Sequence, residues 1–186
     1  MGDETTASGS RSTAMGDETT ASGYASTAMG YETTASGSRS TAMGRITIAS
    51  GTYSTAMGAV TTASGNSSTA MGRDTEASAS YSTAMGRNTT ASDYGSLVIG
   101  QFNSSGSSAT SATSFSTANT AFVIGNGADS SNISDAFSIL FDGTTNIAGS
   151  VTATSFVGDG SGLTGITGTS GSFVDLTTDQ TIAGSK

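Results

Sequence analysis

The chain has 186 residues and contains no cysteine, proline, histidine or tryptophan. Without cysteine, disulfide bonds and thiolate metal sites are excluded; without histidine, the usual catalytic triads and zinc centres are excluded too. Large apolar side chains are also scarce. Leu, Ile, Val and Phe together number 26, and only three of them precede residue 97. The first hundred residues therefore cannot build an ordinary core, and we expect them to pack small side chains closely or to bury surface against other chains.

The charge pattern is weakly acidic and shows no basic patch. The net charge is −8 at pH 7, and residues 1–100 hold 8 acidic and 5 basic side chains. A nucleic-acid partner is not expected, because such a partner requires a basic stripe or patch. No apolar run reaches the length of a membrane span, so we expect none in this segment.

A strict 14-residue repeat dominates the first half of the chain. Every methionine belongs to it and is followed by glycine, and Ile99-Gly100 takes the next place in the series. A fixed period of this kind indicates one structural unit that has been copied and stacked. Because Met1-Gly2-Asp3-Glu4 recurs from Met15, we read Met1 as a repeat residue and expect the chain to be a piece of a longer protein.

Each unit reads Thr-Ala-Ser-Gly-x-x-Ser-Thr-Ala-Met-Gly-x-x-Thr, with a weaker period of seven inside it. A coiled coil is excluded, because each heptad would carry glycine and lack a Leu or Ile seam. Thr and Ser favour extended structure and glycine permits sharp corners, so the unit predicts two short strands that form one flattened coil of a β-solenoid. Seven such coils would make a rod about 34 Å long at the spacing of hydrogen-bonded strands.

Alternation along the strands assigns the faces of the coil. In Ser26-Thr27-Ala28-Met29, Ser26 and Ala28 share one face, and Thr27 and Met29 share the other. Two ladders of alanine recur through the repeats, as a thin coil interior requires. The residues predicted to fill that interior are Ala14, Ala21, Ala28, Ala35, Ala42 and Ala49.

The methionine ladder is then predicted to lie outside the coil. A soluble monomer rarely exposes a long apolar stripe, so we expect the stripes of several identical chains to meet on a common axis. The alternative is a monomeric solenoid with a wider coil that holds the methionines inside. The predicted axis residues are Met15, Met29, Met43, Met57, Met71, Met85 and Ile99.

The residue pairs that follow each glycine differ from copy to copy. Variation at turns with constancy in strands indicates a fixed scaffold that carries tolerant corners. Four tyrosines at these corners are candidate receptor contacts: Tyr24, Tyr31, Tyr53 and Tyr81. The alternative is that an exposed corner simply accepts any soluble residue.

The repeat resembles the YadA-like head of trimeric autotransporter adhesins, whose repeats carry a Ser-Val-Ala-Ile-Gly strand before a short turn. Ser96-Leu97-Val98-Ile99-Gly100 comes nearest to that strand, Ala121-Phe122-Val123-Ile124-Gly125 is a looser version, and the Ser-Thr-Ala-Met-Gly copies fit the same frame. The resemblance covers about residues 1–127. It implies an all-β fold, a left-handed parallel β-roll with three chains around one axis, and adhesion as the usual role.

We divide the chain into three parts. Residues 1–100 are the 14-residue-repeat β-roll, residues 101–135 hold degenerate last coils and a connector, and residues 136–186 form a β-hairpin neck or fibre module that stops as if cut. Within the third part, Asp142-Gly143 predicts a tight hairpin turn. Residues 153–166 and 175–184 resemble segments of phage tail fibres and long bacterial surface fibres.

These observations predict a structural and adhesive segment of a homotrimeric extracellular fibre, without enzymatic activity, cofactor or metal. Its expected partners are copies of itself and a surface receptor or glycan. The fibre is expected to be either a bacterial surface adhesin or the tail fibre of a phage or contractile injection particle. The alternative is a monomeric ice- or ligand-binding solenoid. Ice binding would use a row of threonines along the stack, which Ile48 and Glu76 interrupt: Thr6, Thr20, Thr34, Ile48, Thr62, Glu76 and Thr90.

Overall fold

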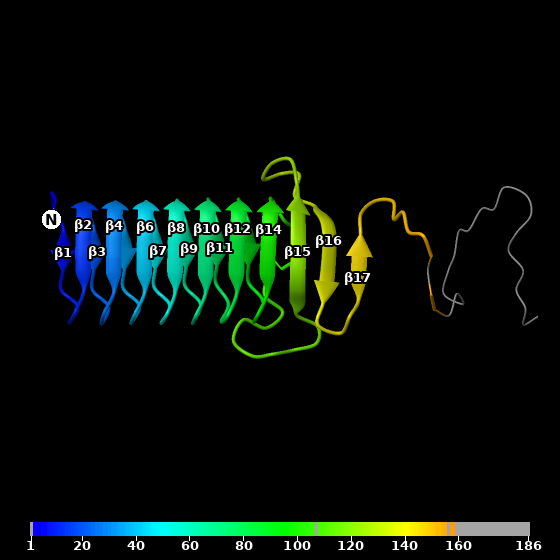
Figure 1. Ribbon diagram of the computed structural model, residues 1–186, viewed down its shortest axis with the longest axis horizontal. Coiled ribbons are helices and arrows are strands. Elements are labelled where there is room, and N and C mark those ends of the chain that lie inside the picture. Colours follow the sequence, from blue (N-terminus) through cyan, green and yellow to red (C-terminus); the bar gives the residue numbers. More distant parts are fainter. Residues whose placement is uncertain (1, 107, 156, 159–186) are drawn as a thin grey trace, which may run out of the picture. The chain divides into compact units, whose positions relative to one another are not determined.

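The computed structural model describes residues 2–106, 108–155 and 157–158, and every regular element in them is a β-strand. Each strand of the repeats pairs in parallel with the equivalent strand of the next repeat, in two sheets that face each other across a thin interior. Successive strands lie side by side in one continuous row (Figure 1). The all-β solenoid predicted from the repeat is confirmed. No helix in the described residues is long and apolar enough to cross a membrane.

The two sheets differ in strand length, and we name them accordingly. The short-strand sheet contains β1 (Thr6–Ala7), β3 (Thr20–Ala21), β5 (Thr34–Ala35), β7 (Ile48–Ala49), β9 (Thr62–Ala63), β11 (Glu76–Ala77) and β13 (Thr90–Ala91). The long-strand sheet contains β2 (Thr13–Asp17), β4 (Thr27–Tyr31), β6 (Thr41–Arg45), β8 (Thr55–Ala59), β10 (Thr69–Arg73), β12 (Thr83–Arg87), β14 (Leu97–Gln101), β15 (Thr120–Asn126), β16 (Asp135–Leu140) and β17 (Thr145–Ile147).

The interior is built from four ladders of small residues. Both alanine ladders are buried: Ala14 is 8% exposed, and the five other predicted interior alanines are fully buried. A serine ladder lies beside them, and each hydroxyl donates to a carbonyl three residues earlier, as Ser54 does to Gly51 at 2.7 Å. The fourth ladder is threonine, which alternation along the strands does not assign to the interior: Thr19, Thr33, Thr47, Thr61, Thr75 and Thr89.

Glycine is required where successive long strands turn into the corner. Gly44 has φ +127°, a backbone conformation that side chains rarely adopt, and a Cβ there would lie 2.0 Å from the carbonyl oxygen of Gly58 in the next coil. The equivalent glycines of neighbouring coils have the same geometry. Close backbone stacking therefore requires glycine at this position of the repeat.

The last coil is closed by an insertion and a hairpin. Leu97 of β14 pairs with Phe122 of β15, so the segment between these partners is longer than the one between Thr83 and Leu97 in the preceding coil. β15 then pairs antiparallel with β16, and β16 with β17, around a turn at Gly143 with φ +90°. The hairpin continues the long-strand sheet (Figure 1). The chain divides into two compact units between Val151 and Thr152. Residues 159–166 and 175–184 of the fibre-like segments lie outside the described residues.

Gly44→Ala should strongly destabilise the solenoid, because the methyl group meets backbone that cannot move away and because φ +127° is unfavourable for alanine. We expect a loss of about 3 kcal/mol or more in the free energy of unfolding, measured by urea denaturation. Gly143→Ala is the matched control, since its φ is also positive but nothing lies within 4 Å of the added Cβ. Equal losses in the two variants would contradict the stacking argument.

Thr47→Val should stabilise the fold. The Thr47 side chain is fully buried and its hydroxyl has no hydrogen-bond partner in the structure. Removing an unpaired buried hydroxyl should raise the free energy of unfolding by about 1 kcal/mol. Ser54→Ala, which removes a hydroxyl with a partner, should lower it by about 1 kcal/mol. Parallel urea denaturation of both variants checks the signs, and a loss of stability in Thr47→Val would show that the threonine ladder is satisfied.

Candidate assembly face and coil edges

The outer side of the long-strand sheet carries a continuous apolar ladder, which we call the methionine face. Along β4, Ala28 points inward and is fully buried, whereas Met29 points outward and is half-buried. Parallel register places each methionine over the next, and the same register continues through Ile99 to Ile124 of β15. Met15, in the first long strand, is 44% exposed. The full set is Met15, Met29, Met43, Met57, Met71, Met85, Ile99 and Ile124.

Two rows of corner residues border this face. The end edge consists of the last residue of each long strand from β2 to β12 together with the residue after it, and of the equivalent first pair Asp3-Glu4. The other pairs are Asp17-Glu18, Tyr31-Glu32, Arg45-Ile46, Ala59-Val60, Arg73-Asp74 and Arg87-Asn88. The start edge consists of the pairs that precede each long strand: Ser10-Arg11, Tyr24-Ala25, Ser38-Arg39, Thr52-Tyr53, Asn66-Ser67, Ser80-Tyr81 and Tyr94-Gly95.

Backbone hydrogen bonds join the rungs of each edge. Glu32 donates its N–H to the carbonyl of Asp17 at 3.0 Å on the end edge, and Arg39 donates to Tyr24 at 2.7 Å on the start edge. The second residue of every one of these pairs has positive φ, including the β-branched Ile46 and Val60. The stacked corners therefore impose a backbone conformation that these side chains would not choose alone.

The start edge is a ladder of arginine and tyrosine. Arg11 donates from Nη1 to the Tyr24 hydroxyl at 2.8 Å, and Arg39 donates from Nη1 to the Tyr53 hydroxyl at 3.1 Å. The Arg39 guanidinium also lies 5.3 Å from the ring centres of both Tyr24 and Tyr53. Further along, Tyr81 and Tyr94 meet edge to face at 5.3 Å. Tyr53 and Tyr81 remain more than half exposed.

The end edge is acidic in its first coils. Partial desolvation raises the pKa of Glu18, and the neighbouring carboxylates of Glu32, Asp17, Glu4 and Asp3 raise it further. A hydrogen bond to Glu32, together with the charges of Glu32 and Glu18, raises the pKa of Tyr31 to about 12. Like charges thus crowd one another along this edge.

The four candidate tyrosines do not form one site. Tyr24, Tyr53 and Tyr81 lie on the start edge, whereas Tyr31 lies on the end edge beside the acidic residues. The structure therefore offers an edge with tyrosine and arginine on one side of the methionine face and, on the other, an edge that is acidic in its first coils.

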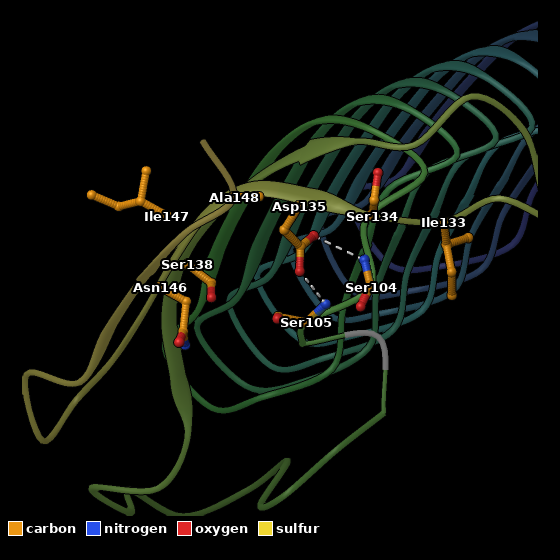
Figure 2. A pocket seen from close by; sticks show the side chains of 9 residues that line it. All are labelled: Ser104, Ser105, Ile133, Ser134, Asp135, Ser138, Asn146, Ile147 and Ala148. Atoms are coloured by element: carbon orange, nitrogen blue, oxygen red, sulfur yellow. Dashed lines mark hydrogen bonds between the residues drawn. The ribbon is translucent and has the colours of Figure 1, made fainter. Parts of the chain in front are cut away.

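A pocket of about 370 Å³ lies where the hairpin meets the inserted loop (Figure 2). Its carboxylate, Asp135, accepts the backbone N–H groups of Ser104 at 2.9 Å and Ser105 at 2.7 Å. Both carboxylate oxygens therefore fasten the loop. No cluster of three or more Asp or Glu that could hold a metal ion occurs in the described residues. We assign the pocket a structural role.

Asp93 is a buried residue whose importance the repeat pattern did not reveal. It stands where five earlier repeats carry glycine and the preceding repeat carries Ala79. It is 1% exposed and accepts the backbone N–H groups of Thr110 at 2.6 Å and Thr120 at 2.8 Å. It thereby anchors the insertion between β14 and β15. Its only signal in the sequence is the loss of glycine at this repeat position.

Asp93→Asn should loosen the insertion, because hydrogen bonds to a charged acceptor are replaced by bonds to a neutral one. We expect a loss of about 2 kcal/mol in the free energy of unfolding and faster hydrogen exchange at the Thr110 and Thr120 amides. Asp129→Asn serves as the matched control, since Asp129 accepts N–H groups in an exposed turn. Unchanged exchange at Thr110 and Thr120 would contradict the anchoring role.

Comparison with protein families matches the chain to a family of repeats. The family model described as YadA head domain repeat (2 copies) matches residues 1–19, 21–45, 49–75 and 77–103, which together make up just over half of the chain. The matched segments include every methionine of the repeat. No curated protein matches the chain.

Proposed function

The chain belongs to the family of YadA head repeats, and from this premise we propose that it is a segment of a homotrimeric fibre that attaches a cell to a host or surface. The repeat is typical of structural adhesins rather than of enzymes. The observation that carries the proposal is the methionine face, a straight apolar stripe on a solenoid whose interior is already full.

Packing supports an assembly in which three methionine faces meet. From β2 to β13 the interior between the two sheets holds only the side chains of Ala, Ser and Thr, so the methionines have no place inside a single coil. Alternation keeps them on the outer side of every long strand. A stripe of this length is normally buried by a partner, and identical copies around one axis bury it most simply.

The magnitudes agree with association through this face. Burying a half-exposed methionine contributes on the order of 1 kcal/mol, and each chain brings seven sites from Met15 to Ile99. Association costs roughly 4–15 kcal/mol in lost freedom of motion. The stripe can therefore offset most of that cost, and contacts outside it decide how tight the assembly is.

The family match also favours a bacterial surface adhesin over a tail fibre. Adhesins of this family are displayed on the outside of cells, so we place the segment extracellularly on a bacterial surface. Most of the residues that resemble tail fibres, 159–166 and 175–184, lie outside the described part of the chain. Receptor or glycan binding would use the exposed tyrosines of the edges, of which Tyr53 and Tyr81 are the most accessible.

The test compares aspartate substitutions on the two outer faces. Met43→Asp with Met57→Asp should convert the trimer to monomers, because charges cannot be buried unpaired at an apolar axis. Ile48→Asp with Thr62→Asp is the matched control, since both residues point outward from the short-strand sheet in the same coils. Light scattering gives the mass, and circular dichroism reports retained strand content.

Three outcomes distinguish the hypotheses. A wild-type chain that is a well-folded monomer would overturn the homotrimer and favour the ice- or ligand-binding solenoid. A trimer that survives the methionine substitutions would overturn the methionine axis. Loss of the trimer in the methionine variant, but not in the control variant on the short-strand sheet, would support the proposal.

A further inference from the structure

The two edges of the coil have complementary chemistry. In the first coils the end edge carries Asp3, Glu4, Asp17, Glu18 and Glu32 without any arginine, and its later coils carry Arg45, Arg73 and Arg87. The start edge carries Arg11 beside Tyr24, and Arg39 between Tyr24 and Tyr53. None of its pairs holds a carboxylate, and that of Asp93, just before Tyr94, is buried against the insertion. Across the described residues the single ion pair is Arg73 with Asp74 at 3.2 Å, so the other edge charges have no ionic partner in that part of the chain.

Rotational symmetry brings these two edges together. The long strands of the repeats all run in the same direction across the stack, so one edge lies at their beginnings and the other at their ends. If the methionine faces of three identical chains meet around an axis along the stack, the end edge of each chain lies beside the start edge of the next. This step rests on the homotrimer proposed above.

We infer that the end edge of one chain binds the start edge of a second copy of this chain, with carboxylates facing arginine and tyrosine in the first coils and arginines facing tyrosines in the later ones. In this arrangement each end-edge pair of one chain faces, on the second copy, the start-edge pair that comes next in sequence after one short strand. Six of these pairings are complementary. They are Glu4 with Arg11, Glu18 with Tyr24, Glu32 with Arg39, Arg45 with Tyr53, Arg73 with Tyr81, and Arg87 with Tyr94.

The chemistry of these contacts selects one axial register. Matching the two ends of the same long strand would instead set Arg45 of β6 against Arg39, two like charges at one level. The register across the short strand avoids this and gives every edge arginine from Arg45 onward an exposed or half-exposed tyrosine. Arginine over a tyrosine face and arginine beside a carboxylate are both favourable pairs. The edge contacts thus fix the axial register of three chains whose repeats are otherwise uniform.

The first test is a charge exchange at one contact, measured by sedimentation equilibrium. Arg39→Glu alone and Glu32→Arg alone should each weaken trimer association at least tenfold, because each sets like charges against one another. The double variant with both changes should restore association, since every interface regains one charge of each sign. Glu76→Arg, a charge reversal of the same kind on the outer side of the short-strand sheet, is the control and should leave association unchanged.

The second test uses the absence of cysteine from the chain. Glu32→Cys with Arg39→Cys puts one thiol on each edge of the same coil. One long strand, about 17 Å in length, separates the edges, so the two thiols of one chain cannot form a disulfide, which requires Cα atoms within about 7 Å. Oxidation should therefore produce covalent trimers on a non-reducing gel. Glu32→Cys with Arg11→Cys, whose partners lie two coils apart, should not.

The outcomes separate this inference from the proposed function. A monomeric wild type would overturn both. A trimeric wild type in which single charge reversals change nothing, or in which the double variant fails to recover, would overturn the edge contact alone. Covalent trimers from the mismatched cysteine pair would overturn the register.

Discussion

The structure depends on the close stacking of each backbone coil on its copy in the next repeat. Parallel hydrogen bonding holds neighbouring strands about 4.8 Å apart, and the corner glycines lie so close that a Cβ would overlap the next coil. The interior between the two sheets is equally thin and is filled by Ala, Ser and Thr. Each repeat must therefore keep these small residues, which explains why the scaffold positions are constant and the corners are not.

A fold with such a thin interior has little hydrophobic stabilisation within one chain. Fourteen buried apolar residues form its core cluster, and twelve of them are alanine. The larger apolar side chains of the repeat lie outside, on the methionine face. The stability that an ordinary domain gains from its core is here available through association, so for this chain folding and assembly draw on the same apolar surface.

The corners show how stacking overrides local preference. Ile46 and Val60 adopt positive φ although β-branched residues disfavour it, because each donates its N–H to the carbonyl of the corresponding residue pair one coil earlier at 2.8 Å. Since the backbone is fixed by its neighbours, the side chains can vary without loss of the fold. The edges can thus carry a charge pattern that differs from coil to coil while the scaffold stays uniform.

The repeat pattern alone predicts the solenoid, its period and its family, because an unbroken repeat with small residues in the strands permits few other structures. It also placed Ala28 and Met29 on opposite faces, since alternation is a property of any strand. The residues that fill the corners and close the last coil are known only from the folded chain. The threonine ladder turns inward after a positive-φ residue, Asp93 anchors an insertion far away in the chain, and Ile124 joins the methionine face beyond that insertion. These features depend on contacts between distant segments, which a repeat pattern does not encode.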